Sequence, residues 1–545
     1  MLLLVGKNIH MAIRMTDDPQ DQNQNDYNDN SGGGGGNRPS IPGGGGGLIA
    51  LLPMLLSLFK GKGIFLLLIL GAGAYFLLGK GGGGCNVADI AQQFSQSGYN
   101  FSPEQFNKAS VYEGLEAEAG KNPLPESVSL LRYAPTRGDQ GAQGSCVAWS
   151  SAYAAQTILT AAATGADPNS IVFSPSYLYN QIKLDDCQGS YVNLAMEAMQ
   201  KNGGVPLSSY PYNPNDCGRD ASQYFNSGRQ NTIHGYTRLT NGNTQTINVR
   251  AIKEHLSKDA PVVIGMMVGN SFMQDMMGKE LWTPQGMDAS MVGMGGHAMT
   301  IIGYDDRKFG GAFQIMNSWG RNWGKDGIGW VRYGDFQQYA REAYGIDALP
   351  KANDVAAKAL ECNIGLVAYE DVNAATKKYM QLRSTGGNSF QSVAPIKVGT
   401  RFKMEVTNAT PCYVYIFSRQ ADGSSAVLFP YLKPGETVSK HSPYFGITGY
   451  RLFPKGQSME ADADGNKDYI AIVTSKSELD YNKLNQAISA SAQTDYAAKV
   501  NDALKGILAI NASISNTNDG RIYFKVNAGE TRAVATVVAF DKVAK

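Results

Sequence analysis

A cysteine, a histidine and an asparagine carry the clearest chemistry in this sequence. Cys146 follows a glycine-rich stretch that begins at Gly138, His297 follows a pair of glycines, and Asn317 begins the stretch Asn-Ser-Trp-Gly320. Nucleophilic thiol catalysis needs a thiol, a base that ionises it and a group that orients the base. Because the three residues lie far apart in the sequence, only the fold can bring their side chains together.

Local pattern predicts the element that would carry the thiol. Residues 146–164 are rich in alanine and contain no helix breaker, and Gly165 follows them directly. This pattern predicts a buried helix with Cys146 in its first turn. The positive end of the helix dipole, together with a nearby imidazolium, would favour the thiolate there.

The base and its orienting group are each next to an apolar run. His297 precedes the run 298–302, which predicts a buried strand, and Asn317 follows Phe313-Gln-Ile-Met316. At such a strand His297 could accept the thiol proton and later protonate the leaving amine. Asn317 would hold the imidazole by its other ring nitrogen.

Four segments of the chain resemble the papain-like cysteine peptidases and together cover residues 123–347. They are Gln140-Gly to Cys146, Tyr210-Pro-Tyr212, Gly296-His297-Ala298 with Gly303-Tyr304, and Asn317-Ser-Trp-Gly-x-x-Trp-Gly-x-x-Gly327. The resemblance implies an α+β domain of two lobes, one helical and one β-barrel-like. It also implies that Gln140 stabilises the oxyanion and that Trp319 covers the hydrogen bond between His297 and Asn317.

The same resemblance suggests where a substrate would bind. The loop containing Gly189 and Ser190 is similar to the family's edge that pairs with the peptide backbone, as an added strand would. Ala298 and the region of Gly265 would line the pocket for the second residue before the scissile bond. These four residues are therefore the candidate substrate-binding residues.

Two cysteines lack the partners that the family would give them. Gln143 and Asn180 occupy the positions where partners of Cys187 and Cys217 would be expected. A substitute Cys187–Cys217 bridge and two free thiols both remain open, and an oxidising compartment would permit the bridge.

Composition limits the remaining functions. The 545 residues carry a net charge of +1 without a dense basic block, so we expect no nucleic-acid partner. The six cysteines are too few for a disulfide scaffold. No constellation suggests a metal site or a second active site, and we expect no cofactor.

The N-terminal part predicts a tail and a membrane segment. Residues 1–47 are rich in Asn, Asp and Gln and then in Gly, which predicts disorder. Residues 48–80 contain two apolar runs, and we expect one transmembrane helix near 64–80 because the run 48–59 is short. Basic residues precede the span, so the N-terminus would be cytoplasmic and the catalytic domain extracytoplasmic. A hairpin of both runs, which would return the catalytic domain to the cytoplasm, is the alternative.

A connecting segment and the catalytic domain follow. Residues 81–122 are interpreted as a linker or stalk, with a short pro-segment as the alternative, since 101–117 could form an inhibitory helix. Of the two we favour the stalk. The peptidase domain is predicted to occupy residues 123–350.

Residues 351–545 predict a mostly-β, sandwich-like accessory domain. Alternating runs separated by turn signals predict strands at 400–406, 413–417, 426–431, 469–474, 521–526 and 533–540. One helix is expected over 480–508, and His441 is isolated and expected at the surface. Phe402-Lys-Met-Glu-Val-Thr-Asn408 and similar stretches resemble an uncharacterised domain appended to bacterial papain-like and caspase-like peptidases. Such a domain could bind a protein or envelope partner.

The sequence therefore predicts a membrane-anchored bacterial cysteine endopeptidase that hydrolyses peptide bonds through a thioester acyl-enzyme. Its substrates would be peptides or proteins, and a single transmembrane helix would attach it to the cytoplasmic membrane. The alternative is a catalytically silent protein that keeps the papain fold and binds peptides or partners.

Overall fold

The structure is a computed structural model of the chain. It describes residues 13–18, 98–117, 120–242, 244–291, 294–351, 359–369, 377–431, 439–455, 457–509, 512–526 and 533–544. These residues belong to one unit, Met1–Pro19 with Ser95–Lys545, whereas a second unit, Gln20–Phe94, lies outside them. The predicted membrane segment 48–80 therefore also lies outside the described residues. Within those residues, no helix has the length and apolar character needed to cross a bilayer.

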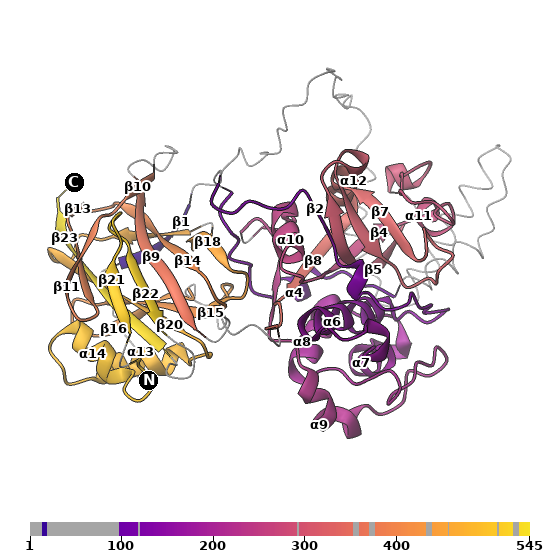
Figure 1. The fold of residues 1–545 in the computed structure, drawn as a ribbon, viewed down its shortest axis with the longest axis horizontal. Helices are drawn as coiled ribbons and strands as arrows, with labels where there is room; N and C mark the ends of the chain where they lie inside the picture. The colour runs from indigo at the N-terminus through magenta and orange to yellow at the C-terminus, as the bar shows by residue number, and fades with distance from the viewer. Residues whose placement is uncertain are drawn as a thin grey trace, which may run out of the picture. The chain divides into compact units, whose positions relative to one another are not determined.

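Helices form one lobe of the predicted peptidase domain, and Figure 1 shows α6 to α9 gathered on one side of this domain's sheet. The predicted helix after Cys146 is present as α5, a π-helical stretch over Trp149–Gln156, and α6. It ends at Gly165, whose φ of 73° lies in the left-handed region that glycine adopts without steric cost. The helices are α4 (Pro103–Phe106), α5 (Cys146–Ala148), α6 (Thr157–Thr164), α7 (Pro175–Ile182), α8 (Val192–Lys201), α9 (Phe225–Gly228), α10 (Val249–Leu256), α11 (Asn270–Met273) and α12 (Tyr333–Tyr339).

The second lobe is built on an antiparallel sheet in the order β3-β8-β4-β5-β6-β7, with β2 paired to β5. The strands are β2 (Ser127–Ser129), β3 (Tyr236–Arg238), β4 (Val262–Val268), β5 (Gly295–Asp305), β6 (Ala312–Met316), β7 (Ile328–Arg332) and β8 (Ala340–Ile346). β5 begins two residues before His297, and β6 ends directly before Asn317. Since β5 and β6 are neighbours, the fold brings the base and its orienting amide together.

The C-terminal domain consists of two sheets that enclose a shared apolar core. The first contains β1 (Ile13–Asp17), β9 (Leu360–Tyr369), β10 (Lys377–Tyr379), β14 (Arg401–Asn408), β18 (Gly449–Phe453), β19 (Gln457–Ala461), β21 (Ser513–Asn516) and β22 (Ile522–Val526). The second contains β11 (Leu382–Gly386), β12 (Ser389–Ser392), β13 (Ile396–Lys397), β15 (Cys412–Arg419), β16 (Ser425–Phe429), β17 (Tyr444–Phe445), β20 (Lys467–Ser475) and β23 (Ala533–Val543). This arrangement confirms the predicted sandwich.

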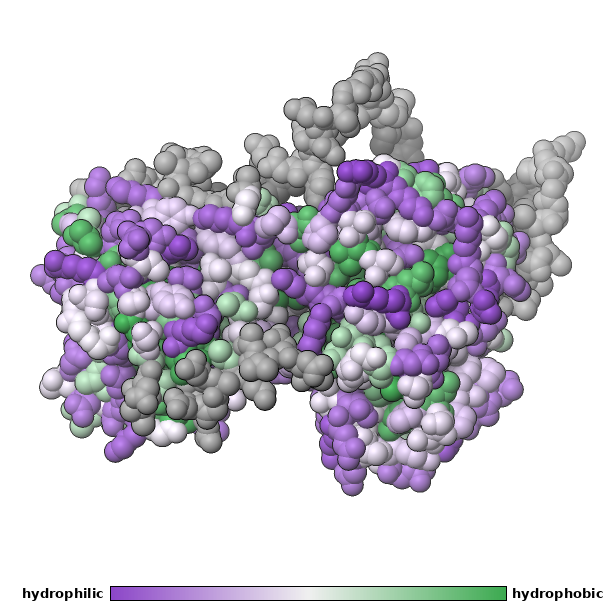
Figure 2. Space-filling model, in the orientation of Figure 1, coloured by the Kyte–Doolittle hydropathy of each residue, from purple (hydrophilic) through white to green (hydrophobic). Residues whose placement is uncertain are grey.

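Two helices rather than one cover the second sheet. α13 (Tyr481–Ala490) and α14 (Tyr496–Ala503) pack an apolar cluster against the sheet's outer side, and Figure 1 shows both helices at one end of the domain. The single helix expected over 480–508 is wrong because Asp495 caps a new helix, accepting a hydrogen bond from the N–H of Ala498. On the face drawn in Figure 2, hydrophobic residues occur in small areas separated by hydrophilic ones.

The prediction of disorder over 1–47 is wrong for the short strand β1. Ile13 and Met15 are buried in the sandwich core, and β1 pairs with β19 over its whole length. Asp18 forms an ion pair with Lys403 at 2.6 Å. The alternation of apolar and polar residues in β1 is typical of an edge strand, although the polar composition around it conceals the pattern.

The pairing of β1 with β19 also bears on membrane topology. Residues 13–17 and 457–461 must lie on the same side of any membrane while they share a sheet. One crossing within residues 20–94 would place them on opposite sides. The expected single span, with the N-terminus inside and the catalytic domain outside, is therefore incompatible with this pairing.

Candidate active site

Cys146 lies at the first residue of α5 and is fully buried, with 0% exposure. The backbone N–H groups of Ala298 and Val147 interact with the thiol and favour its ionised form. Burial has the larger effect and raises the pKa of Cys146 to about 12. The interaction with Ala298 places the thiol beside the residue that follows His297 in β5.

His297 is held by Asn317 in one defined orientation. The Nε2 of His297 lies 2.7 Å from Asn317 Oδ1, and the N–H of Ser318 donates to the same oxygen at 2.7 Å. Because Oδ1 can only accept, Nε2 of the neutral imidazole carries the proton and Nδ1 has the lone pair. Nδ1 is buried and has no hydrogen-bond partner within the described residues. It is therefore the atom that can accept a proton from a thiol.

Trp319 stacks on the imidazole of His297. The two ring centroids are 4.1 Å apart and the ring planes differ by 20°. The indole thus lies against the imidazole that bonds to Asn317, as the family resemblance implies. Burial lowers the pKa of His297 to about 4, and the hydrogen bond to Asn317 opposes this effect only in part.

Burial shifts the pKa of Cys146 and that of His297 in opposite directions, each towards the uncharged form. A thiol with a pKa of about 12 and an imidazole with a pKa of about 4 both favour their uncharged forms at neutral pH. The sequence instead predicts a thiolate stabilised by the helix dipole and an imidazolium. The difference arises because removing two ions from water opposes charge separation more strongly than one helix end favours it.

Gln140 is held near the N-terminus of the helix that begins at Cys146. Its Oε1 accepts a hydrogen bond from Ser318 Oγ at 2.7 Å, and its Nε2 donates to the carbonyl of Gln143 at 2.9 Å. Tyr212 supports this turn by donating from its hydroxyl to the Gln140 carbonyl at 2.7 Å. Since one N–H of the Gln140 side chain supports the turn, the other is the donor that could bind an oxyanion.

A segment that precedes the catalytic domain pairs with the predicted substrate edge. The N–H of Asn100 donates to the Ser190 carbonyl at 2.9 Å, and the N–H of Ser190 donates to the Gly98 carbonyl at 2.9 Å. Both bonds flank Tyr99, so residues 98–100 run parallel to the edge at Ser190. A Cβ on Gly98 would lie 2.0 Å from the carbonyl oxygen of Gly144, close to Cys146 in sequence.

The side chain of Tyr99 fills the pocket next to this edge. A Cβ on Gly265 would lie 2.1 Å from Tyr99 Cζ, and one on Gly296 would lie 2.6 Å from Cδ1. Tyr99 is 5% exposed, and its phenol interacts electrostatically with Glu342 and with Cys146. Residues 98–100 therefore occupy the place where the sequence predicts the substrate.

Glu342 lies in the same pocket as Tyr99 and is itself buried. The hydroxyl of Tyr344 donates to Glu342 Oε2 at 3.1 Å, and the hydroxyl of Tyr99 also interacts with the Glu342 carboxyl. Burial raises the pKa of Glu342 to about 8, so the carboxyl is mostly protonated at neutral pH. The pocket thus combines small residues with one buried acid.

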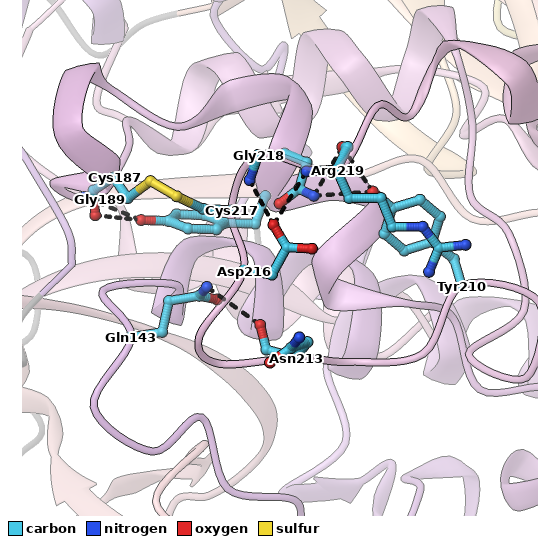
Figure 3. The surroundings of a disulfide bond; sticks show 11 residues. Gln143, Cys187, Gly189, Tyr210, Asn213, Asp216, Cys217, Gly218 and Arg219 are labelled. Carbon is cyan, nitrogen blue, oxygen red and sulfur yellow. Dashed lines mark hydrogen bonds between the residues drawn. A yellow bond between two sulfur atoms is a disulfide. The ribbon is translucent and has the colours of Figure 1, made fainter.

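Cys187 and Cys217 form a disulfide with a Cα–Cα distance of 6.3 Å. This is the bridge that the sequence analysis left open against free thiols. Figure 3 shows the disulfide beside Gly189, with the side chain of Gln143 directed at the carbonyl of Asn213 from another loop. The bridge therefore supports the loop that carries the substrate edge.

The structure brings together every sequence-predicted site residue. Gly189 lies against residues 98–100 and Ser190 forms hydrogen bonds with them. Gly265 faces Tyr99, and the backbone N–H of Ala298 contacts the thiol of Cys146. Sequence reasoning missed the roles of Tyr99, Glu342, Tyr212 and Ser318. The last two lie inside the quoted motifs and could have been found there, whereas no local pattern marks Tyr99 or Glu342.

Comparison with known proteins agrees with this geometry. Residues 132–348 match the model of the papain family cysteine proteases, and residues 396–478 match a domain of unknown function, DUF4384. Residues 132–348 are thus similar to the papain family cysteine proteases.

Individual relatives are distant. Cathepsin K of Mus musculus is 26% identical over 37% of this chain and 58% of its own length. A probable cysteine protease, RDL2, of Arabidopsis thaliana is 27% identical over 35% of this chain and 49% of its own length. The chain thus spans about half the length of the curated relatives it matches. The crystal structure of xylellain, a cysteine protease from Xylella fastidiosa, is 22% identical with a TM-score of 0.39, covering 47% of this chain and 97% of its own.

Proposed function

We propose that the papain-family domain makes this protein a cysteine peptidase that hydrolyses peptide bonds through Cys146, His297 and Asn317. One observation supports this most strongly. Asn317 binds the Nε2 side of the His297 ring and leaves Nδ1 as an acceptor, in the same site where Ala298 contacts the Cys146 thiol. Such an acceptor beside a thiol is what nucleophilic catalysis needs.

The reaction follows from these positions. The proton of the Cys146 thiol moves to His297 Nδ1 as sulfur attacks the substrate carbonyl, and the oxyanion that forms is stabilised by the Gln140 side chain and the Cys146 N–H. The imidazolium then protonates the amine as the C–N bond breaks, which leaves a thioester on Cys146. Water activated by His297 cleaves the thioester, releases the carboxylic acid and restores the thiol.

The structure corresponds to a closed form of this enzyme. Residues 98–100 use both hydrogen-bonding groups of Ser190, so a substrate cannot pair with this edge until they leave. Their departure admits water, which removes part of the desolvation that raises the pKa of Cys146 and lowers that of His297. These contacts favour a short pro-segment over the stalk that the sequence suggested for this region.

Covalent labelling separates the peptidase from the catalytically silent alternative. Full-length protein is treated with an epoxysuccinyl thiol reagent and digested, and the adduct is located by mass spectrometry. A peptidase is labelled at Cys146, and the label abolishes cleavage of peptide substrates; Cys146→Ser is neither labelled nor active. Protein that opens its cleft but shows neither labelling nor cleavage would support a binding function instead.

Membrane attachment through residues 48–80 is part of the proposal, with no net crossing between β1 and β19. A hairpin of the two apolar runs satisfies the pairing of these strands. Such a hairpin would leave both of its ends on one side of the membrane, and the Cys187–Cys217 disulfide favours the extracytoplasmic side over the cytoplasmic one. Tags placed before β1 and after residue 545 should both be accessible from the same side of intact cells, and access from opposite sides would contradict this topology.

A further inference from the structure

Residues 98–117, here called the strap, contact both the cleft and the C-terminal domain. Residues 98–100 lie in the cleft, and α4 follows with Phe106 fully buried, its ring meeting the ring of Tyr344 edge-on at 5.4 Å. Residues 110–116 then run between the peptidase domain and the C-terminal domain. The strap is thus one continuous segment with a different binding surface at each end.

The peptidase domain binds this second part of the strap through two groups. The backbone N–H of Arg238 in β3 donates to the carbonyl of Ser110 at 2.9 Å, and the backbone carbonyl of Arg238 accepts from the N–H of Tyr112 at 3.1 Å. The buried carboxylate of Glu254 accepts from the hydroxyl of Tyr112 and the N–H of Leu115, at 3.2 and 3.1 Å. The strap therefore continues the edge of the peptidase sheet at β3.

The C-terminal domain holds the same residues from the other side. The N–H of Val111 donates to the carbonyl of Lys440 at 2.7 Å, and the N–H of Glu116 donates to that of Tyr450 at 3.1 Å. Glu116 also forms an ion pair with Lys455. Val111 thus bridges a peptidase strand and the C-terminal domain at once.

Glu113 is the centre of this contact. Its Oε1 lies 2.6 Å from His441 Nδ1, its Oε2 accepts from the N–H of Lys455 at 3.0 Å, and its carbonyl accepts from Arg451 Nε at 3.2 Å. The other ring nitrogen of His441, Nε2, lies 3.1 Å from Gln457 Oε1. The expectation that His441 lies isolated at the surface is therefore wrong.

Burial makes this contact selective for the strap. Glu113 and His441 are almost fully buried, and Arg451 is 0% exposed. Buried polar groups and charges are stable only while paired, so the C-terminal domain exposes unpaired groups whenever the strap leaves. The strap is consequently the occupant that this surface of the C-terminal domain is built to bind.

We propose that the C-terminal domain is the anchor that keeps the inhibitory segment in the peptidase cleft. The strap opens as one local unit, so weakening its anchor at Glu113 raises the population in which Tyr99 has left its pocket. The effect on catalysis rests on the proposed peptidase function, whereas the effect on cleft opening does not. The C-terminal domain would thereby regulate the peptidase without contacting its catalytic residues.

Glu113→Ala in the full-length protein tests this proposal. The first readout is hydrogen exchange at the N–H groups of Asn100 and Ser190, and the second is the alkylation rate of Cys146 by iodoacetamide, located by peptide mass. Both should rise about tenfold, the effect of losing one interaction of ~1.4 kcal/mol. Glu361→Ala is the matched control, since Glu361 pairs with Lys525 in the same domain, and both readouts should stay unchanged.

The outcomes distinguish the anchor from the peptidase proposal. Faster exchange and alkylation without peptide cleavage would support the anchor and count against the peptidase. Unchanged exchange and alkylation in a folded Glu113→Ala protein would overturn the anchor. Should that variant unfold, shown by faster exchange in β20, Glu113→Gln replaces it. Glutamine keeps the shape but loses the charge facing His441, so about threefold faster opening is expected, and no change would likewise overturn the proposal.

Discussion

Truncating Tyr99 should release the cleft while leaving Cys146, His297 and Asn317 intact. Tyr99→Ala removes a ring that is 5% exposed and contacts Gly265 and Gly296. Removing a buried aromatic side chain costs about 3–5 kcal/mol. We expect the lower end or less, about 2–3 kcal/mol, because opening the cleft returns to water the phenol of Tyr99 and the carboxyl of Glu342, which are buried together in the closed form.

The loss of this free energy raises the population of the open form, in which the Cys146 thiol is exposed. Since about 1.4 kcal/mol is a factor of ten, the open population should rise by roughly 30- to 150-fold. While opening is rare, the alkylation rate of Cys146 is proportional to that population. The rate of iodoacetamide labelling at pH 7 should therefore rise by a similar factor.

The pH dependence of alkylation provides a second readout. Burial raises the pKa of the Cys146 thiol to about 12 in the closed form. Water in the opened cleft reduces this effect, so the labelling rate of Tyr99→Ala should level off at a lower pH than that of the unsubstituted protein. Phe101→Ala is the matched control because Phe101 belongs to the same strap but is 37% exposed. If Tyr99→Ala keeps its unfolding transition and is labelled no faster than Phe101→Ala, residues 98–100 do not control access to the thiol.

Three further changes test the site and the stability of the fold. Gln140→Ala should lower kcat about 10²–10³-fold with little change in KM, because the lost donor acts on the oxyanion; an unchanged kcat in steady-state assays would remove Gln140 from the mechanism. Trp319→Ala admits water to His297, so the pKa of His297 should rise from about 4 towards its ordinary value, and the acid limb of the rate profile should move to higher pH. Burial raises the pKa of Asp347 from 3.8 to about 7, so its protonated form stabilises the fold at low pH and this stability is lost as pH rises through 7. Asp347→Asn should therefore raise the free energy of unfolding at pH 8.5 by at most about 4 kcal/mol, which is measured as a higher Tm. At pH 4 the Tm should stay nearly unchanged, and equal shifts of Tm at both pH values would contradict this assignment.

Membrane topology shows how one distant pairing changes a local prediction. The two apolar runs in residues 48–80 suggest a single span because the first is short. The short strand β1 pairs with β19 and so requires both ends of that segment to lie on one side. The signal in β1 is only a brief alternation of apolar and polar residues at Ile13 and Met15. The average composition of the tail conceals this alternation.

The sequence by itself determined the features that depend on local pattern. Residue type and motif pointed to Cys146, His297 and Asn317 as candidate catalytic residues, and periodicity predicted most of the central strands of the sandwich, since side chains alternate along any half-buried strand. It also pointed to Ser190 and Gly265 as substrate-binding residues. None of these inferences needed to know which distant segment would fill the cleft.

Only the tertiary structure decided the state of the site. Tyr99 reaches the pocket of Gly265, and Glu113 reaches His441, through contacts between segments that are remote in the sequence. The same burial raises the pKa of the Cys146 thiol, because desolvation depends on everything that surrounds the thiol rather than on the helix that carries it. Residue order can supply a nucleophile and its base, but whether they are charged and accessible depends on which other part of the chain excludes the water.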